Sequence, residues 1–436
     1  MISVEEARSI VLDWCRPLPF ARIPLADALG RLLAEPVVSD IDLPPFDKAV
    51  VDGYAVRASE CADPGPHRLT IGEEIPAGKT PTRPLAVGEA AIIMTGAPLP
   101  DGADAVVMHE KTRMGEDGRV LLPGPVSPGA GCLKRGREMK AGQVVLQARD
   151  SLNAIKLGVL ASVGQSLVTV APRPRVSIIP TGDELVPADK TPGPGQIRET
   201  NSTVLSGLVR TMHAEAIVHA TVPDEPEALE RAIGRALADR PDVLILCGGV
   251  SAGKRDLVPA ALAANGVTTL FHKVRVKPGK PLLFGVATHG VPVPDRSKFD
   301  DRTKIDNSAS LLRPEDALTL VYGLPGNPVS GIVGFLLFVA PALSRMSRGK
   351  LMGDSWSRAH ADRDKARLAI PFRQRGDRPA YHPVAWMPSP GGEVTPLPWA
   401  GSSDLLTIAK ADGFARFEAG DRDYEAGEEV EFLRLP

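Results

Sequence analysis

The sequence predicts a multidomain protein of the α/β plus β class, and three patterns support this prediction. Residues 173–349 alternate apolar strand-like runs with helical segments, which is typical of a doubly wound, parallel α/β domain covered on both faces. Residues 41–138 and 350–436 instead hold short alternating runs broken by proline and glycine, which predicts two small β domains. The length of 436 residues agrees with several domains of ordinary size.

The N-terminal residues 1–40 are expected to begin with a helix. Ser3 and Glu6 have the spacing of a capping box, and an apolar face follows them. Residues 139–172 return to a helical pattern, which is clearest over 151–161 and could pair with the N-terminal helix. We therefore predict a helical linker domain made of 1–40 and 139–172, with the β domain 41–138 inserted between its halves.

The expected elements of the larger domains can be read in chain order. Five runs predict the strands of the inserted domain: 54–58, 67–75, 89–96, 104–110 and 118–122. In the α/β domain the predicted strands are Val176–Pro180, Ala214–Val222, Asp242–Cys247, Val267–Phe271 and Leu318–Val321. The predicted helices are Ser202–Met212, Glu225–Ala238, Asp256–Ala264 and Pro328–Ser344.

Two further segments of the α/β domain need an interpretation of their own. The apolar run 331–343 is too short to span a bilayer and contains Pro341, so we expect a buried core helix. The segment 295–306, within the stretch 289–316, is rich in aspartate, lysine and arginine and has no periodicity. We expect a solvated insertion there, with a functional lid as the alternative.

The composition excludes several classes of protein. A formal net charge of −2 gives no field that attracts nucleic acid or anionic membranes, and 4% aromatic residues argue against a stacking groove for single strands. The four cysteines are far apart and form no CxxC motif, so neither a zinc site nor a disulfide scaffold is expected. The acidic, helical N-terminus is unlike a signal peptide. A cytoplasmic protein is the prediction.

Turns rich in glycine and proline follow several strands of the α/β domain, at the edge where such folds bind ligands. They read PTGDELV, CGGVSAGKRD, VKPGKP and GLPGNPVSG. Such turns let backbone N–H groups point at an anion, and lysines held between prolines suit phosphate or another oxyanion. The residues expected to bind the anionic ligand are Thr181, Gly182, Asp183, Gly248, Gly249, Ser251, Lys277, Lys280, Pro325, Gly326, Asn327, Pro328 and Ser330.

Carboxylates in the same turns predict a magnesium site. Asp183, Glu184 and Asp256 would supply hard oxygen ligands, which fits a phosphorylated substrate bridged by a metal. A P-loop is excluded, because Arg255 stands where that motif has Ser or Thr. Taken singly, the acids have plainer explanations: Asp183 and Glu184 could favour a helix dipole, and Asp224 could be a helix N-cap. The convergence of four turns favours a shared site.

Outside the α/β domain, two more turns contain polar residues. Asp52 lies beside a Gly-Tyr turn, and Thr95 lies in a similar Thr-Gly turn. Taken singly, these are connections of a β domain. His109 has no partner nearby in the sequence, and we expect a satisfied or exposed histidine there.

The chain resembles the molybdopterin molybdotransferase family, the bacterial molybdenum-insertion proteins that also include the C-terminal domain of gephyrin. The resemblance covers residues 3–433, and its segments occur in the family's order. They are PPFDKAVVDGYAV, IMTGAPLPDGADAVV, TGDELV, GGVSAGKRD, VKPGKP, GLPGNPVS, RPAYHP and GSSDLLTIAKADG.

The resemblance implies a homodimer whose subunits have a helical linker domain, an inserted β domain, an α/β molybdopterin-binding domain (173–349) and a C-terminal β barrel (350–436). It implies binding of adenylylated molybdopterin, Mg²⁺-dependent cleavage of its anhydride, and insertion of molybdate to give molybdenum cofactor and AMP. A molybdopterin-adenylylating protein would act upstream. Apo-molybdoenzymes or their chaperones would accept the product.

The same resemblance implies roles for individual residues, in a cleft shared between the α/β domain of one subunit and the inserted domain of the other. The family's catalytic positions match Asp52, Thr95, Glu184, Asp224 and Asp256. Its anion-binding positions match Lys277, Lys280 and Ser330, and its molybdate-binding tail positions match Arg378 and either Ser402 or Ser403.

The chain departs from the family pattern at several positions. It has Ala49 for a serine, Arg137 and Glu138 for Glu and Asp, Lys254 for an acid or small polar residue, Pro383 for a second tail arginine, and a longer charged insertion. A non-catalytic molybdopterin-binding or scaffold paralogue on the same fold is the alternative reading. The sequence also leaves open whether molybdate or tungstate is preferred, because these oxyanions are nearly equal in size.

Overall fold

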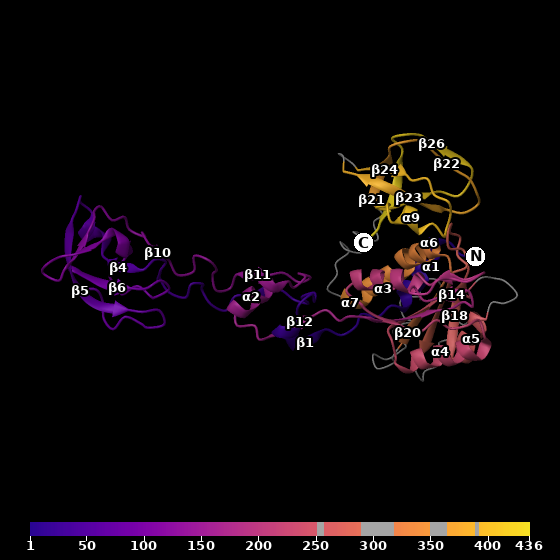
Figure 1. Ribbon diagram of the computed structural model, residues 1–436, viewed down its shortest axis with the longest axis horizontal. Coiled ribbons are helices and arrows are strands. Elements are labelled where there is room, and N and C mark those ends of the chain that lie inside the picture. The colour runs from indigo at the N-terminus through magenta and orange to yellow at the C-terminus, as the bar shows by residue number, and fades with distance from the viewer. Residues whose placement is uncertain (251–256, 289–317, 349–363, 389–391) are drawn as a thin grey trace, which may run out of the picture. The chain divides into compact units, whose positions relative to one another are not determined.

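The structure is a computed structural model that describes residues 1–250, 257–288, 318–348, 364–388 and 392–436. The chain divides into two compact units (Figure 1). Unit 1 contains Met1–Phe20 and Ala171–Pro436, and unit 2 contains Ala21–Val170. Four residues singled out from the sequence, Ser251, Lys254, Arg255 and Asp256, lie outside the described residues, and so does the charged insertion 289–316.

Unit 1 is built on a six-stranded sheet. Its strands are β13 (Arg175–Pro180), β16 (Glu215–Val218), β17 (Val243–Cys247), β18 (Val267–His272), β19 (Leu283–Thr288) and β20 (Leu318–Leu324). They lie in the order β16-β13-β17-β20-β19-β18, and the first four are parallel. β19 runs antiparallel to both neighbours, so the sheet is mixed and the prediction of a wholly parallel sheet is wrong. The reason is that β19 returns from β18 through a short loop, without the crossover that a parallel pair needs.

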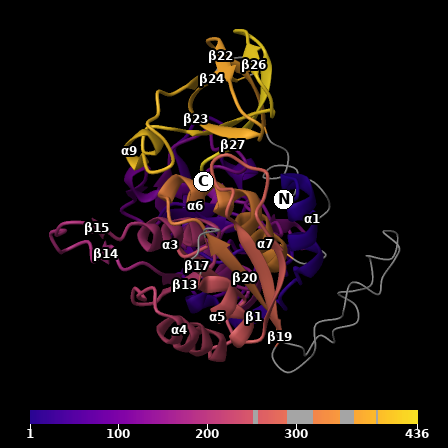
Figure 2. The same cartoon turned by 90° about the vertical axis from the view of Figure 1, so that its right-hand side faces the viewer.

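Helices cover both faces of this sheet. On one side lie α4 (Pro226–Ala238) and α5 (Val258–Ala264), and on the other lie α3 (Asn201–Thr211) and the long helix that begins at Pro328 (Figures 1 and 2). Along β17 the side chains alternate between the two cores: Ile245 joins one, while Leu244 and Leu246 join the other. The predicted helices and the doubly wound arrangement are therefore confirmed.

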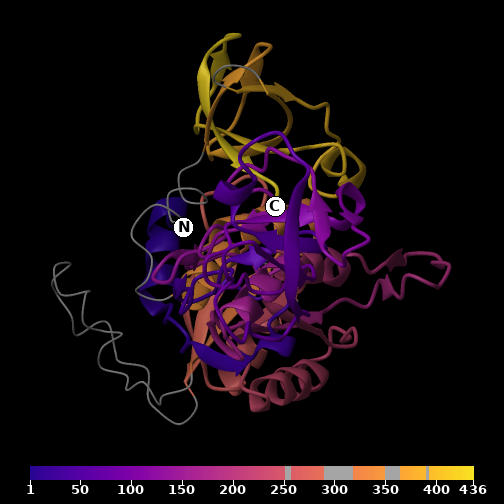
Figure 3. The same cartoon turned by 90° about the vertical axis from the view of Figure 1, so that its left-hand side faces the viewer.

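A small arm leaves the sheet just after β13. It consists of the parallel pair β14 (Leu185–Val186) and β15 (Ile197–Arg198), which projects away from the sheet (Figures 2 and 3). The arm is joined to the turn after β13 by a backbone bond, in which the Ile197 N–H donates to the Glu184 carbonyl at 2.8 Å.

The long helix consists of α6 (Pro328–Gly334), the π-helical segment η7 (Phe335–Val339) and α7 (Ala340–Arg348). The Ala340 N–H donates to the Phe335 carbonyl, five residues back. This wider turn lies just before Pro341, whose ring would clash with a carbonyl in a regular α-helix. The span Pro328–Ser347 is long and apolar enough to cross a membrane, but 78% of its most apolar stretch is buried. It is the core helix that the sequence predicts.

The N-terminal helix α1 (Val4–Trp14) also belongs to unit 1. The Ser3 hydroxyl caps it by accepting the Glu6 N–H at 3.0 Å, as predicted. Its buried residues, which include Val11 and Trp14, lie in the core of unit 1. Helix α2 (Ala154–Ser162) packs instead in a separate core of unit 2. The two helices therefore contribute to different cores, and an apolar face in the sequence does not by itself identify the core that it joins.

The C-terminal region of unit 1 is a closed five-stranded barrel, as expected. The barrel strands are β21 (Asp364–Leu368), β23 (Ala380–Met387), β24 (Glu393–Pro396), β25 (Gly413–Phe417) and β27 (Glu429–Arg434). A ribbon of β22 (Phe372–Gln374) and β26 (Arg422–Tyr424) and the short helix α9 (Leu405–Ile408) accompany them. The barrel residues Tyr381, Ile408 and Phe414 join the main core of unit 1.

Unit 2 contains a second six-stranded sheet. Its strands are β4 (Gly53–Val56), β5 (His67–Ile75), β6 (Glu89–Ile93), β7 (Ala105–Met108), β8 (Arg113–Met114) and β9 (Val120–Leu122), in the order β7-β4-β6-β5-β9-β8. All five runs predicted as strands form strands. Two-stranded pairs and α2 complete the unit: β1 (Ala21–Pro24) with β12 (Leu167–Val170), β2 (Val37–Val38) with β11 (Val144–Leu146), and β3 (Lys48–Ala49) with β10 (Cys132–Leu133).

Candidate functional site

The turns after β13, β17 and β20 contact one another at one edge of the unit 1 sheet. The Thr181 N–H donates to the Cys247 carbonyl at 3.0 Å, and the Gly248 N–H donates to the Leu324 carbonyl at 3.1 Å. A Cβ added to Gly326 would lie 3.6 Å from the Gly248 Cα. The predicted anion-binding turns of the sheet therefore form one continuous surface of backbone.

Glycine is required where two of these turns approach most closely. Gly248 has a φ of 108°, and a Cβ there would lie only 2.4 Å from the Thr181 carbonyl oxygen. The adjacent Gly249 has a φ of 63°, which also favours glycine. Only residues without a side chain let the backbone of β17 turn this close to the end of β13.

Three carboxylates gather beside these turns. The Asp224 N–H donates to Asp183 Oδ1 at 3.0 Å, which joins the turn after β16 to the turn after β13. Burial raises the pKa of Asp224, and the negative charges of Asp183 and Glu184 raise it further. The residue that caps α4 is Glu225, so the alternative reading of Asp224 as that helix's N-cap is wrong.

These carboxylates supply the oxygen ligands and the negative charge that a hard cation such as Mg²⁺ prefers. Within the described ranges no three His, Cys, Asp or Glu residues are grouped as a complete metal site, and Asp256 lies outside those ranges. Mg²⁺ needs no such cage, because it usually takes one or two carboxylates together with substrate phosphates and water. The crowded negative charge around Asp224 is what a bound cation would offset. Asp183 and Glu184 therefore fit a magnesium ion that is shared with a phosphorylated ligand.

We expect Asp224→Asn to raise the melting temperature at pH 7 in metal-free buffer. Because the folded-state pKa of Asp224 is raised, its contribution to stability is complete at low pH and is lost as the pH rises through that pKa. The gain of the variant should therefore shrink on acidification. Calorimetric scans at pH 7 and pH 4 test this, with the exposed Asp239→Asn at the opposite end of α4 as the control. A gain that is equal at both pH values would contradict it.

The turn after β20 is held from two sides. The Asn201 side chain, at the start of α3, donates to the Gly326 carbonyl at 2.7 Å. Asn327 caps α6 by position, as predicted, but its side chain donates to Ser402 Oγ of the barrel at 2.9 Å. The Val329 N–H donates to the Ser402 carbonyl at 3.0 Å. Ser402 therefore holds the turn, whereas the neighbouring Ser403 is exposed.

The lysine-bearing turn lies against the same helix start. A Cβ added to Gly279 would lie 3.5 Å from the Ser330 carbonyl oxygen. Lys277 and Lys280 are both exposed, and neither forms an ion pair with any described residue. Arg378 of the barrel donates from Nη1 to the Val276 carbonyl at 3.0 Å, one residue before Lys277. The backbone of the lysine-bearing turn therefore lies against the start of α6 at the buried Ser330, and Arg378 holds the same turn from the barrel.

Unit 2 contains the remaining predicted residues, Asp52 and Thr95, in direct contact. Asp52 Oδ1 accepts the Thr95 N–H at 2.6 Å and the Thr95 hydroxyl at 2.7 Å. These two bonds lower the pKa of Asp52, and the electrostatic interaction with His109 adds to the effect. The backbone N–H of His109 donates to the Asp52 carbonyl at 3.2 Å, and the ring centroids of His109 and Tyr54 lie 4.8 Å apart in a T-shaped arrangement. His109 belongs to this cluster, although no pattern in the sequence points to it.

Replacing Thr95 by valine should raise the pKa of Asp52 toward its ordinary value. The variant removes the hydroxyl donor but keeps the backbone N–H, so a partial rise is expected. A carboxyl-detected NMR titration of Asp52 measures it. Thr112→Val, which removes a hydroxyl that donates to the His109 carbonyl at 2.8 Å, is the control. An Asp52 pKa that moves equally in both variants would argue against the assignment.

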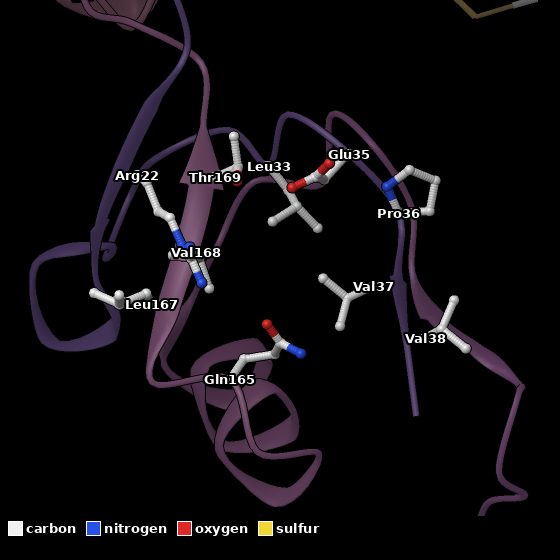
Figure 4. A pocket seen from close by; sticks show the side chains of 10 residues that line it. All are labelled: Arg22, Leu33, Glu35, Pro36, Val37, Val38, Gln165, Leu167, Val168 and Thr169. Atoms are coloured by element: carbon white, nitrogen blue, oxygen red, sulfur yellow. The ribbon is translucent and has the colours of Figure 1, made fainter. Parts of the chain in front are cut away.

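The structure thus forms two clusters of predicted residues. Unit 1 brings together those from the turns after its strands and from the barrel, and unit 2 brings Asp52 to Thr95. Sequence reasoning missed Asn201 and His109, and the only available signal for Asn201 was the polar run at the start of its helix. A cavity of about 430 Å³ in unit 2 is lined by other residues, among them Arg22, Glu35 and Gln165 (Figure 4). No predicted site residue lines it.

Comparison with known proteins places these clusters in context. Three family models match in succession: "MoeA N-terminal region (domain I and II)" at residues 2–164, "Probable molybdopterin binding domain" at 177–345 and "MoeA C-terminal region (domain IV)" at 365–435. A molybdopterin molybdenumtransferase from Nostoc sp. is 34% identical over all of this chain and 94% of its own length. One from Haemophilus influenzae is 32% identical over 80% of this chain and 79% of its own.

A solved structure agrees with these matches over the full length. The crystal structure of the molybdopterin biosynthesis MoeA protein from Pyrococcus horikoshii is 30% identical, covers 100% of this chain and 99% of its own, and superposes with a TM-score of 0.73. The order of the matched regions is the order in which the sequence segments occur. The chain belongs to the MoeA family of molybdopterin molybdenumtransferases.

Proposed function

We propose that the protein is a molybdopterin molybdotransferase, which inserts molybdate into adenylylated molybdopterin and releases AMP. The observation that carries the proposal is the set of features found at one edge of the unit 1 sheet. Three features lie together there: glycine-rich backbone turns, two lysines that form no ion pair with a described residue, and a crowded group of carboxylates. A ligand with several negative oxygens and a bound cation satisfies all three.

The residues at this edge of the sheet can be assigned separate roles in the reaction. Lys277 and Lys280, with Ser330, Arg378 and Ser403, suit a tetrahedral dianion, which needs cationic and hydroxyl donors. The backbone N–H groups of Gly249 and Gly326 suit the phosphate oxygens, whereas those of Gly182 and Gly248 already donate to the Val222 and Leu324 carbonyls. Asp183 and Glu184, together with Asp256, would hold Mg²⁺. When bound, that ion would offset negative charge as the anhydride P–O bond breaks.

Asp52 and Thr95 would complete the site from unit 2. Asp52 is a carboxylate at neutral pH, and its bonds to Thr95 lower its pKa further, so it suits orienting water or substrate better than accepting a proton. We propose that the protein is a homodimer and that unit 2 of the partner subunit supplies these residues.

The remaining parts of the proposal follow from the same activity. We propose the boundaries 1–40 with 139–172, 41–138, 173–349 and 350–436 for the four domains, with α1 packing in the core described above for unit 1. The protein would work in the cytoplasm, without nucleic acid or membrane. A molybdopterin-adenylylating protein would supply its substrate, and apo-molybdoenzymes or their chaperones would take its product.

Release of AMP from adenylylated molybdopterin tests the function directly. We expect release that requires both molybdate and Mg²⁺, and growth of a strain that lacks molybdenum insertion when the gene is supplied. Tungstate in place of molybdate measures the preference between the two oxyanions. A well-folded protein that binds the pterin but releases no AMP would favour the non-catalytic scaffold instead.

A further inference from the structure

The turn that carries Lys277 and Lys280 is closed by backbone bonds of its own, but the backbone bonds of Lys277 itself lead outside the turn. It connects β18 to β19 over residues 273–282. Four backbone bonds lie within it: Lys273 N–H to the Leu282 carbonyl, Val274 N–H to the Lys280 carbonyl, Val276 N–H to the Val274 carbonyl, and Leu282 N–H to the Lys280 carbonyl. Gly279 has a φ of 111°, in the region that favours glycine. The position of the Lys277 backbone within this turn therefore depends on the segments that pair with it from outside.

Two segments from distant parts of the chain pair with its backbone. On one side the N-terminus adds a parallel bridge from Ile2 to Val274, and the Arg275 N–H donates to the Ile2 carbonyl at 2.9 Å. On the other side the start of β23 pairs with Lys277 itself. The Lys277 N–H donates to the Pro379 carbonyl at 2.9 Å, and the Lys277 carbonyl accepts the Tyr381 N–H at 2.7 Å.

Two arginines cross between the turn and the barrel at the same place. Arg275 of the turn donates from Nη2 to the Asp377 carbonyl of the barrel at 3.2 Å. Arg378 of the barrel donates from Nη1 to the Val276 carbonyl of the turn at 3.0 Å. Both bonds are charge-assisted and run in opposite directions, close to the Lys277 pairing. We call Arg275, Arg378 and the Lys277 pairing the strap.

We propose that the strap makes Arg275 a positioning residue for the oxyanion site, because it fixes the backbone of Lys277 against the C-terminal barrel. The Arg275 side chain binds the Asp377 carbonyl, so its effect on the ligand is indirect and depends on the position of Lys277. This inference rests on the proposed function, because Arg275 is given the role of holding Lys277, and Lys277 is proposed to bind the substrate oxyanion. Groups that bind a ligand work best when neighbouring bonds hold their geometry.

The strap also gives Arg378 a second role. One of its nitrogens is committed to the Val276 carbonyl, and Nε lies 3.5 Å from Asp377 Oδ1. Arg378 can therefore hold the turn and present its remaining N–H groups to the oxyanion. Arg275 is the better residue for a test, because it is not among the residues assigned to ligand binding.

The experiment compares Arg275→Ala, Arg275→Lys and a control, Arg373→Ala, in the full-length protein. Arg373 is an exposed barrel arginine paired with Asp423 at 3.0 Å, so its loss removes the same charge without touching the strap. Amide hydrogen exchange at Lys277 and Tyr381 reports directly on the pairing. Isothermal titration with molybdate reports on the oxyanion site without turnover. Steady-state AMP release separates KM for molybdate from kcat.

Arg275→Ala should speed exchange at Lys277 and Tyr381 by at least about tenfold, because local opening of the strap is no longer opposed. It should weaken molybdate binding and raise KM by about tenfold, the factor of one charge-assisted hydrogen bond, with a smaller change in kcat. Arg275→Lys should restore part of both effects. Arg373→Ala should match the wild type in every measurement.

Any other pattern overturns the inference. Weaker molybdate binding with unchanged exchange would mean that Arg275 acts by its charge. Faster exchange with unchanged molybdate binding would mean that the strap does not serve the site. Failure of the proposed function is distinguishable, because the wild type itself would then release no AMP. Amide exchange and molybdate titration would still show whether Arg275 holds the backbone of Lys277.

Discussion

Lys277→Ala is expected to lower molybdate-dependent AMP release by about 10²–10³-fold while leaving the fold intact, the usual cost of removing one group that stabilises negative charge in a transition state. The lysine is exposed and forms no ion pair with a described residue, so its loss breaks no structural contact of the side chain. Its backbone bonds to Pro379 and Tyr381 do not depend on the side chain and should survive.

The measurement is single-turnover AMP release at saturating adenylylated pterin, with circular dichroism to verify the fold. Lys190→Ala is the matched control, because Lys190 is an exposed lysine of unit 1 whose side chain has no partner within the described ranges. Asp256→Ala should show a loss of the same order if that residue helps to hold the metal. Unchanged turnover in both Lys277→Ala and Asp256→Ala would refute the site assignment.

The elements of the fold could be predicted where a local pattern determines them. The strands of unit 2 and the alternating elements of the α/β region follow from periodicity and from punctuation by glycine and proline, which act over a few residues. Turns that follow parallel strands must meet at one edge of a sheet. For this reason the residues Thr181, Gly248 and Asn327 could be placed together from the amino-acid sequence alone.

The features that could not be predicted depend on contacts between distant segments. The direction of β19 depends on its loop, and the partner of α1 depends on which core has room for its apolar face. Arg275 binds the carbonyl of Asp377, 102 residues later in the chain. Asn201 and Gly326 are similarly distant, 125 residues apart. Single side chains with long-range partners leave no periodic signal in a sequence.

Gly248→Ala is the second change for which we expect a large effect, here on stability. The new methyl group would lie 2.4 Å from the Thr181 carbonyl oxygen and 2.9 Å from its hydroxyl, and the backbone would keep a φ of 108°. The carbonyl is backbone at the end of β13, so it cannot rotate away as a side chain would. Strain and overlap together should cost about 4 kcal/mol of unfolding free energy.

Gly266→Ala separates the two causes. Gly266 also has a positive φ, 74°, but a Cβ there would meet nothing within 4 Å. That variant should therefore lose only the free energy of the backbone strain, about 1 kcal/mol. Denaturant unfolding of both variants measures the difference, which isolates the close approach of the two strand ends. If Gly248→Ala were no less stable than Gly266→Ala, then β13 and β17 would not meet as closely as the anion-binding surface requires. The continuous backbone between Thr181 and Gly326 would then no longer be an argument for a single site.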